Sequence, residues 1–297
     1  MKVLITGSAG FLGRHFTTWL GEDGHEVVEV DVADSAEPTD ALDFFRCSSL
    51  SVDLLIHCAA VSPHRAAIDG KALAVGVGNL ELDAAMFQWA ARTRPGRVVY
   101  FSSSAAYPIE NQQTWRGGLS EPEVDPSYPE QPDAIYGWVK LTGERLARHY
   151  REQGGAVTVL RPFSGYGEDQ STNFPFGAFA ERARRREDPF TVWGDGTQVR
   201  DWIHVDDIVG AVLAAVGNGV DGPVNLCTGV GTSMAELAAL FAAEAGYGPA
   251  FNFLTDKPAG VAYRVGDPSS LHEFYRPKVS IEEGVRRALA EVSHATA

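Results

Sequence analysis

The chain has 297 residues, 44% of them hydrophobic, which is enough apolar material for one large α/β domain or for a domain with a smaller lobe. Its 25 basic and 39 acidic residues give a net charge of −14, which argues against sequence-independent binding to nucleic acid or to an anionic membrane. Three scattered cysteines form no Cys-x-x-Cys pair, so neither a disulfide framework nor a metal site is indicated. No apolar run is long enough to span a membrane and no leader-like segment is evident, so we expect a cytoplasmic protein.

Six short apolar runs alternate with helix-length segments along the chain. They are KVLIT (2–6), EVVEV (26–30), DLLIH (53–57), RVVYF (97–101), AVTVL (156–160) and PVNLC (223–227). Strands that alternate with helices are typical of a parallel sheet covered on both faces. We therefore predict a doubly wound α/β domain over residues 1–165, which the chain re-enters near 200–228, and a smaller discontinuous lobe over 166–297.

The first of these runs leads into a glycine-rich segment, TGSAGFLG. Gly7, Gly10 and Gly13 allow a tight turn at the start of a helix, where a pyrophosphate can sit on the free amide donors. Asp31 closes the next strand, and its carboxylate can accept from ribose hydroxyls while repelling the 2′-phosphate of NADP. Arg14 could pair with such a phosphate, but it is more simply a solvated side chain. The segment predicts a dinucleotide site that prefers NAD.

A long segment between residues 108 and 133 is rich in proline, glutamate and glutamine and has few aliphatic residues. This composition predicts a loop. Its length indicates that the loop is either functional or mobile.

The segment AIYGWVKLTGERL (134–146) predicts the helix that precedes the strand AVTVL. Its apolar stripe consists of Ile135, Val139, Thr142 and Leu146. Tyr136, Lys140 and Gly143 then fall on a neighbouring face, which a ligand can approach closely. Tyr136 and Lys140 lie one turn apart, so the ammonium can come near the phenol. By itself this pair is also consistent with two solvated neighbours on a helix surface.

Together these segments resemble the extended short-chain dehydrogenase/reductase family, and within it the NAD-dependent nucleotide-sugar epimerases and dehydratases. The resemblance is carried by the glycine loop, LLIHCAA (54–60), FSSSAAY (101–107), YGWVK (136–140), LRPFSGYG (160–167) and RDWIHVDD (200–207). It implies a Rossmann-type fold with a smaller C-terminal substrate-binding lobe, NAD as cofactor and a nucleoside-diphosphate sugar as substrate. It also implies a homodimer formed by the Tyr136 helix and the helix before it.

The resemblance further implies roles for particular residues. Tyr136 is the general base, Lys140 favours its phenolate and holds the nicotinamide ribose, and Ser103 hydrogen-bonds the reacting oxygen. The implied cofactor-binding residues are Gly7, Gly10, Phe11, Leu12, Gly13, Asp31, Ala59, Ala60, Tyr136 and Lys140. The implied substrate-binding residues are Ser103, Ser104, Asn173, Arg200 and Arg264. Ser102 and Ser104 are rivals for the role of Ser103, and Asn173 could instead cap the following helix.

The residues after Ser103 bear on the reaction. Dehydratases of this family place an Asp-Glu pair there, whereas this chain has Ser104 and Ala105. Elimination of water then has no obvious acid or base, so we favour an NAD-dependent 4-epimerase for a UDP-hexose or UDP-hexuronate. The alternatives are a 4-ketoreductase that consumes reduced cofactor, a dehydratase, and a non-catalytic dinucleotide-sensing protein on the same fold.

Overall fold

The computed structural model of the chain describes residues 1–33, 39–61, 71–114, 117–124 and 132–290. Its centre is a six-stranded sheet with the strand order β2-β1-β3-β4-β5-β9, in which all neighbouring strands are parallel. The strands are β1 (Lys2–Thr6), β2 (Glu26–Val30), β3 (Leu54–His57), β4 (Arg97–Phe101), β5 (Val157–Pro162) and β9 (Val224–Leu226). They correspond to the six predicted runs, so the predicted α/β fold with a parallel sheet is confirmed.

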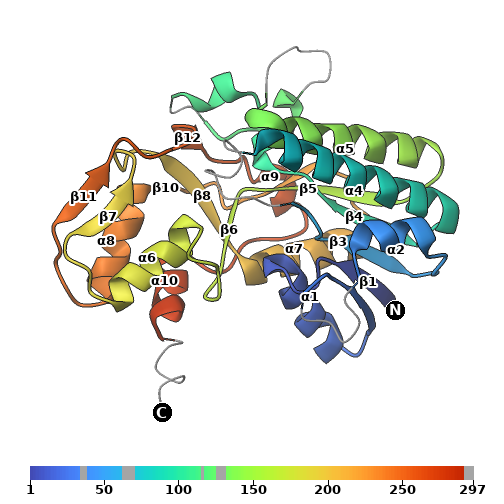
Figure 1. Cartoon of the computed structure of the whole chain (residues 1–297), viewed down its shortest axis with the longest axis horizontal. Coiled ribbons are helices and arrows are strands. Elements are labelled where there is room, and N and C mark those ends of the chain that lie inside the picture. Colours follow the sequence, from blue (N-terminus) through green and yellow to red (C-terminus); the bar gives the residue numbers. More distant parts are fainter. Residues whose placement is uncertain (34–38, 62–70, 115–116, 125–131, 291–297) are drawn as a thin grey trace.

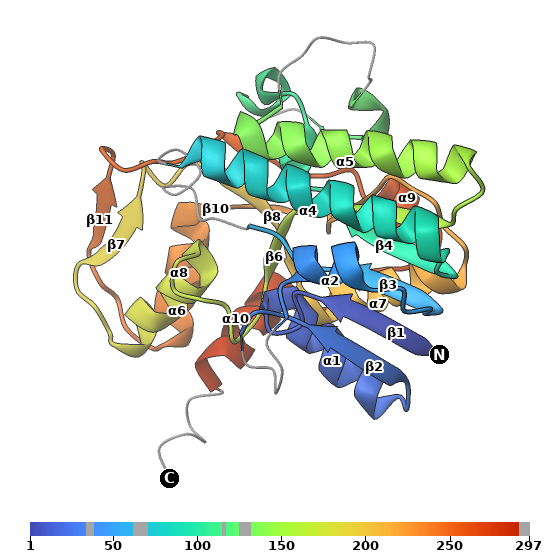
Figure 2. The same cartoon turned by 45° about the vertical axis from the view of Figure 1, so that its right-hand side comes forward.

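Helices cover both faces of this sheet (Figures 1 and 2). One face carries α1 (Phe11–Glu22) and α7 (Val205–Gly217), and the other carries α2 (Ala41–Cys47), α4 (Ala72–Thr93) and α5 (Ala134–Glu152). Successive side chains of a strand point to opposite faces, so Val3 and Ile5 join the first core and Leu4 joins the second. Among the described residues, no helix is both long enough and apolar enough to cross a membrane.

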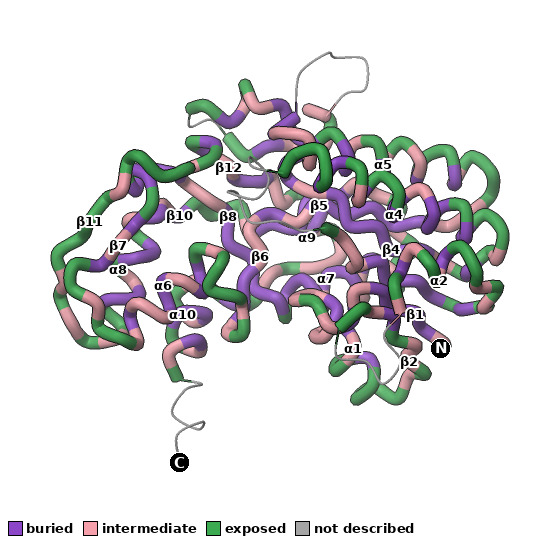
Figure 3. The backbone as a smooth tube through the Cα atoms, in the orientation of Figure 1, coloured by how far each residue is buried: buried purple, intermediate pink, exposed green. Residues whose placement is uncertain are grey.

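A smaller second lobe is built from the later part of the chain (Figure 1). Its elements are α6 (Pro175–Arg184), β7 (Phe190–Trp193), α8 (Met234–Glu244), β11 (Phe251–Leu254) and α10 (Ile281–Ala290). The core of this lobe is aromatic, because the ring of Phe176 lies 4.4 Å from that of Tyr166 and 5.0 Å from that of Phe241. Figure 3 shows that the strands of the central sheet are largely buried, whereas β11, at the outer edge of the second lobe, is largely exposed.

Strand β8 (Val199–His204) lies between the two lobes and leads directly into α7 (Figure 1). It pairs with β6 (Ser164–Tyr166), β10 (Gly231–Ser233) and β12 (Tyr263–Arg264) rather than with the central sheet. Its fully buried Asp201 accepts hydrogen bonds from the amides of Thr228, Gly229 and Gly266. One carboxylate therefore holds the segments that follow β9 and β12 against β8.

The segment 108–133, predicted as a loop, has more local structure than its composition indicated. It contains the short 3₁₀ helices η2 (Ile109–Gln112) and η3 (Glu121–Glu123). The buried Leu119 donates a backbone hydrogen bond to Val265 at 2.8 Å and accepts one from Asp267 at 2.9 Å. The segment is therefore anchored at Leu119 to the chain around the end of β12. Residues 115–116 and 125–131 of the predicted loop lie outside the described residues.

Candidate active site

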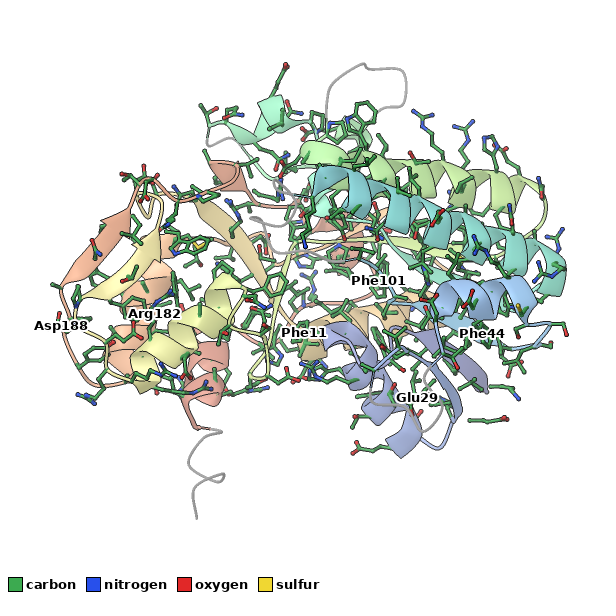
Figure 4. The ribbon with its side chains drawn as sticks, viewed as in Figure 1. Phe11, Glu29, Phe44, Phe101, Arg182 and Asp188 are labelled. Atoms are coloured by element: carbon green, nitrogen blue, oxygen red, sulfur yellow. The ribbon has the colours of Figure 1, made fainter. Side chains whose placement is uncertain are left out.

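The predicted site segments meet at the carboxyl end of the central sheet. They begin with Gly7 after β1, Asp31 after β2, Ala59 and Ala60 just beyond β3, and Ser103 after β4. Because neighbouring parallel strands end at the same edge of a sheet, these segments lie together, where this fold class binds its ligands. In Figure 4, Phe11 at the start of α1 and Phe101 at the end of β4 both lie near the middle of the molecule.

The glycine loop is packed too tightly for larger side chains. Gly7 has a φ of +71°, and a Cβ atom on Gly13 would lie 1.9 Å from the carbonyl oxygen of Gly7. Gly10 begins α1 without a side-chain cap, and the first turn of that helix carries no acidic residue. The helix therefore presents its first amides and the positive end of its dipole without competition, which fits the pyrophosphate of a dinucleotide.

Asp31 lies beside this loop with its carboxylate held in place. It accepts hydrogen bonds from the amide of Ala9 at 2.9 Å and from that of Ala33 at 3.0 Å. Among the described residues each carboxylate oxygen accepts one hydrogen bond, and a carboxylate oxygen can accept a second one from a ribose hydroxyl. Ala59 lies against the loop as well, because a Cβ atom on Gly7 would be 2.6 Å from its amide nitrogen.

Arg14, interpreted as a solvated side chain, is 39% exposed in the structure and also forms an ion pair at the surface. Its guanidinium binds Asp169, with Nε 2.6 Å from Oδ2, and His15 contacts the same carboxylate at 3.1 Å. Arg14 thus links α1 to the turn that follows β6. A side chain engaged in this way is poorly placed to receive a 2′-phosphate, which agrees with the preference for NAD inferred from Asp31.

The segment that follows Ser103 packs closely on the helix that carries Tyr136. The 3₁₀ helix η1 (Ser104–Ala106) packs on the first turn of α5, where a Cβ atom on Gly137 would lie 2.1 Å from the carbonyl oxygen of Ala105. The Ser103 hydroxyl oxygen accepts from the amide of Ala105 at 3.0 Å. Its O–H therefore stays available to donate to a bound substrate oxygen.

Lys140 accompanies Tyr136 on α5 and is almost completely buried. Its ammonium lies 5.8 Å from the centre of the Tyr136 ring and 5.1 Å from that of Tyr100, a residue of β4. Tyr136 itself is only partly buried. Lys140 thus places a positive charge next to a tyrosine that a ligand can reach.

The predicted stripe on α5 was partly wrong. Thr142 is exposed, and the most buried positions include Lys140 and Gly143, on the face that we expected a ligand to approach. The space beside Gly143 is filled by Tyr100, because a Cβ atom there would lie 1.8 Å from the Tyr100 hydroxyl. Close approach at Gly143 therefore serves packing against β4 rather than contact with a ligand.

Ser102 and Ser104, the rivals of Ser103, have other surroundings. The Ser102 hydroxyl donates to Glu144 at 2.5 Å, and Ser104 is buried within η1. Glu144 also accepts two hydrogen bonds from the buried guanidinium of Arg161, each 2.8 Å long. This bidentate pair raises the pKa of Arg161, against the effect of burial, and ties β5 to α5.

The two arginines predicted to clamp a diphosphate come together in the structure. Arg200 in β8 and Arg264 in β12 are register partners in a parallel pair. The Arg200 guanidinium donates to the carbonyls of Val199 and Ala259, at 2.8 and 3.3 Å. That of Arg264 donates to Asp133 at 2.6 Å and also to Gln112. Both arginines therefore already carry hydrogen bonds to protein groups.

Asn173 is exposed just before α6. The residue that begins this helix is Phe174, with no side-chain cap, so the alternative role of Asn173 as a helix cap was wrong. The amide of Asn173 donates to the Ser171 hydroxyl at 3.3 Å. Its side chain stays a candidate for ligand contact.

A buried polar cluster beneath Lys140 was missed in the sequence. It comprises Asp83 in α4, Tyr100 in β4 and His57 in β3. Asp83 lies on the face of α4 that also buries Asn79, Leu82 and Met86. A carboxylate on the apolar face of a helix is rare without a partner, and this signal was available in the sequence.

Comparison with known proteins places this geometry in a family. The model of the NAD-dependent epimerase/dehydratase family matches residues 3–227, so the chain belongs to this family and uses NAD as its cofactor. GDP-mannose 3,5-epimerase of Arabidopsis thaliana is 27% identical over 313 residues, covering 96% of this chain and 80% of that protein. A putative UDP-glucose 4-epimerase of Methanocaldococcus jannaschii is 28% identical over 318 residues and covers 97% of both chains.

A solved structure shows the same fold. It is the UDP-glucose 4-epimerase of Thermotoga maritima with UDP-glucose, which has a TM-score of 0.84 and 24% identity and covers 100% of both chains. The resemblance to nucleotide-sugar epimerases and dehydratases of the extended short-chain dehydrogenase/reductase family is therefore confirmed. The protein is an NAD-dependent enzyme of this epimerase/dehydratase group.

The packing of Gly13 yields a test of the cofactor site. Gly13→Ala should weaken NAD binding by at least about tenfold, or ~1.4 kcal/mol, because the new methyl group pushes α1 away from Gly7. Gly21→Ala in the same helix is the matched control, since a Cβ atom there meets nothing within 4 Å. Calorimetric titration with NAD and thermal melting of both variants separate binding from folding. Equal NAD affinity in the two variants would contradict the assignment.

Proposed function

We propose that this protein is a nucleoside-diphosphate-sugar 4-epimerase that acts on a UDP-hexose or UDP-hexuronate through a transient 4-keto sugar. One observation carries the proposal. At Gly137 the segment that follows Ser103 packs on the turn of α5 that carries Tyr136, with Lys140 beside the Tyr136 ring, while the positions after Ser103 hold Ser104 and Ala105 instead of carboxylates. The choice of UDP follows from the UDP-glucose epimerases among similar proteins.

These side chains support reversible oxidation of a secondary alcohol. Ser103 donates a hydrogen bond to the C4 oxygen and fixes its position. The Lys140 ammonium stabilises the phenolate form of Tyr136, which accepts the hydroxyl proton and becomes a neutral phenol while hydride leaves C4. Bound NAD supplies the hydride acceptor and donor. After the 4-keto sugar has turned over, Tyr136 returns the proton as hydride returns to the opposite face, so the substrate is isomerised with no net redox change.

Elimination of water would need an additional acid and base at the sugar. Two carboxylates of the surrounding elements, Glu144 and Asp133, are engaged by Arg161 and Arg264. Carboxylates that are held by guanidinium groups are poor proton donors. This favours epimerisation over the dehydratase alternative.

Arg200 and Arg264 are proposed to anchor the diphosphate while the sugar turns over. The two guanidinium groups project from register partners on neighbouring strands, and one of them, Arg264, is also paired with Asp133. A guanidinium matches the geometry of phosphate oxygens. The net charge of −14 makes such a local positive site necessary for an anionic substrate.

The reaction itself is directly testable. Purified protein with NAD should convert UDP-glucose or UDP-glucuronate into its C4 epimer, with no change in mass and no consumption of added reduced cofactor. Tyr136→Phe should abolish turnover and keep the fold, because it removes only the ionisable oxygen. NMR and mass spectrometry of the products are the measurements. A product lighter by one water would establish a dehydratase, and stoichiometric oxidation of reduced cofactor would establish a ketoreductase.

Arg200→Ala tests the diphosphate anchor. It should weaken binding of the UDP-sugar by roughly 2–3 kcal/mol, the scale of a lost charge-assisted contact, and leave NAD affinity nearly unchanged. Arg185→Ala is the control, since the Arg185 side chain is 68% exposed on the second lobe. Calorimetry with UDP and with the UDP-sugar measures both affinities. The anchor is wrong if Arg200→Ala binds UDP-sugar as tightly as Arg185→Ala does.

We also propose that the protein forms a homodimer through α4 and α5. These helices pack side by side (Figure 2) and expose large apolar side chains. On α4, Leu73, Val77 and Leu80 are 79%, 46% and 41% exposed, at a spacing that puts them on one helix face. On α5, Trp138 is 44% exposed. Pairing two copies of such a surface would remove these side chains from water.

Val77→Asp tests this interface. Sedimentation should give the wild type twice the 32.0 kDa mass of the chain and the variant the mass of one chain. Two buried carboxylates would face each other across the two-fold axis, which opposes association. Trp19→Ala is the control, because Trp19 is also largely exposed but lies on α1, across the sheet. A wild-type monomer, or a dimer that survives Val77→Asp, would exclude this interface.

A further inference from the structure

Lys140 is a positive charge in an almost dry place. Its side chain is buried, with a relative exposure of 3%. An ammonium without a counter-charge in such a place tends to lose its proton. A neutral lysine would not stabilise a phenolate on Tyr136, so the proposed reaction depends on what keeps Lys140 charged.

Asp83 is the carboxylate placed to do this. It projects from α4 into the core with a relative exposure of 2%. Its Oδ2 accepts a hydrogen bond from the Tyr100 hydroxyl at 2.6 Å. Its Oδ1 lies 3.5 Å from Nε2 of His57, and neither of these two atoms has a hydrogen-bond partner among the described residues. A buried carboxylate oxygen left in this state is costly unless a cation is close.

Tyr100 connects Asp83 to Lys140 physically. Its ring lies 5.1 Å from the Lys140 ammonium, and its hydroxyl binds Asp83. The missing side chain of Gly143 makes room for this hydroxyl against α5, because a Cβ atom there would overlap it. Asp83 of α4, Tyr100 of β4 and Gly143 of α5 thus pack together next to Lys140.

The other ionisable groups around Lys140 are neutral or already paired. Burial lowers the pKa of His57, whose Nδ1 lies 2.7 Å from the Thr6 hydroxyl, so its ring is uncharged. Burial raises the pKa of Cys58, and burial together with Asp83 raises that of Tyr100. Glu144 on α5 is paired with Arg161, as described above.

The two remaining charges support each other. Burial disfavours the charged form of Lys140, but Asp83 and then Tyr136 more than offset it, so the pKa of Lys140 lies above its ordinary value. Burial likewise disfavours the Asp83 carboxylate, but Lys140, His57 and Tyr100 hold its pKa below its ordinary value. The charged forms of Asp83 and Lys140 thus favour each other, with Tyr100 lying against both side chains.

We propose that Asp83 is a positioning residue for catalysis: held by the Tyr100 hydroxyl, it is the counter-charge that keeps Lys140 protonated beside Tyr136. This rests on the proposed function for its catalytic meaning. The state of the Lys140 ammonium can nevertheless be measured without any substrate. The consequence for pH is definite, because losing Asp83 lowers the pKa of Lys140 and activity is then lost at a lower pH on the alkaline side.

The decisive measurement is the titration of Lys140 by NMR in the substrate-free protein. The chain has only five lysines, Lys2, Lys71, Lys140, Lys257 and Lys278, so ¹³C-labelled lysine side chains give few signals. The signal lost in Lys140→Arg identifies Lys140. In the wild type it should stay in the ammonium form up to at least about pH 10, near the ordinary lysine range. In Asp83→Asn its midpoint should fall by at least about one pH unit.

Asp207→Asn is the matched control. Asp207 is also a buried carboxylate, bound by the Tyr275 hydroxyl and by the amides of Lys278 and Val279, but it lies on α7, across the sheet. The substitution Asp207→Asn should lower the stability of the protein and leave the titration midpoint of Lys140 unchanged. The proposal fails if Lys140 is neutral at pH 8 in the wild type, or if Asp83→Asn and Asp207→Asn give the same midpoint. The first of these outcomes is readable even if Asp83→Asn does not fold.

The pH profile of turnover separates this proposal from the proposed function. In Asp83→Asn the alkaline limb of kcat/KM should move down in pH with the NMR midpoint, while a purely structural role would lower activity equally at all pH values. If the wild type turns over no nucleotide sugar, the proposed function fails, and the NMR titration still decides whether Asp83 holds the charge of Lys140. A shifted NMR midpoint with an unmoved alkaline limb would overturn the positioning role alone.

Discussion

The close packing of α5 against the end of β4 is the constraint on which the site depends. Two glycines of α5 allow it, since Gly137 lies against Ala105 and Gly143 lies against Tyr100. The first contact packs the segment after Ser103 on the helix turn that carries Tyr136, and the second accompanies an aromatic ring 5.1 Å from the Lys140 ammonium. A methyl group at either position would push the helix away from the strand. In the proposed mechanism, Ser103 and Tyr136 would then be too far apart to act on the same substrate oxygen.

Electrostatics imposes a second requirement, because an acidic protein must bind two anionic ligands. The cofactor pyrophosphate fits the open N-terminus of α1, where backbone amides supply the positive potential without a charged side chain. For the proposed sugar diphosphate, the candidate partners are two arginines that are register partners on β8 and β12. Positive potential is thus available at particular points, the start of α1 and the β8–β12 pair, in a chain whose net charge is −14.

Much of the fold could be predicted because it follows from local patterns. The six strands are continuous apolar runs, since both faces of a parallel sheet are covered. The spacing of the glycines is fixed by the tight turn and by the close approach of a pyrophosphate to the backbone. The details of α5 were less accessible. Helical periodicity predicted one apolar stripe, but the buried face of α5 includes Lys140. A search for apolar residues does not find this face, because lysine counts as a polar residue.

The sequence by itself determined the order of strands and helices, the glycine loop, the acid after the second strand and the Tyr136–Lys140 spacing, because each is an interaction among residues near in sequence. Only the tertiary structure decided which distant residues share a site. His57, Asp83, Tyr100 and Lys140 come from four different elements, and Arg14 meets Asp169 across 155 positions. Such contacts are set by how the layers pack, and no local pattern in the chain encodes the distance between layers.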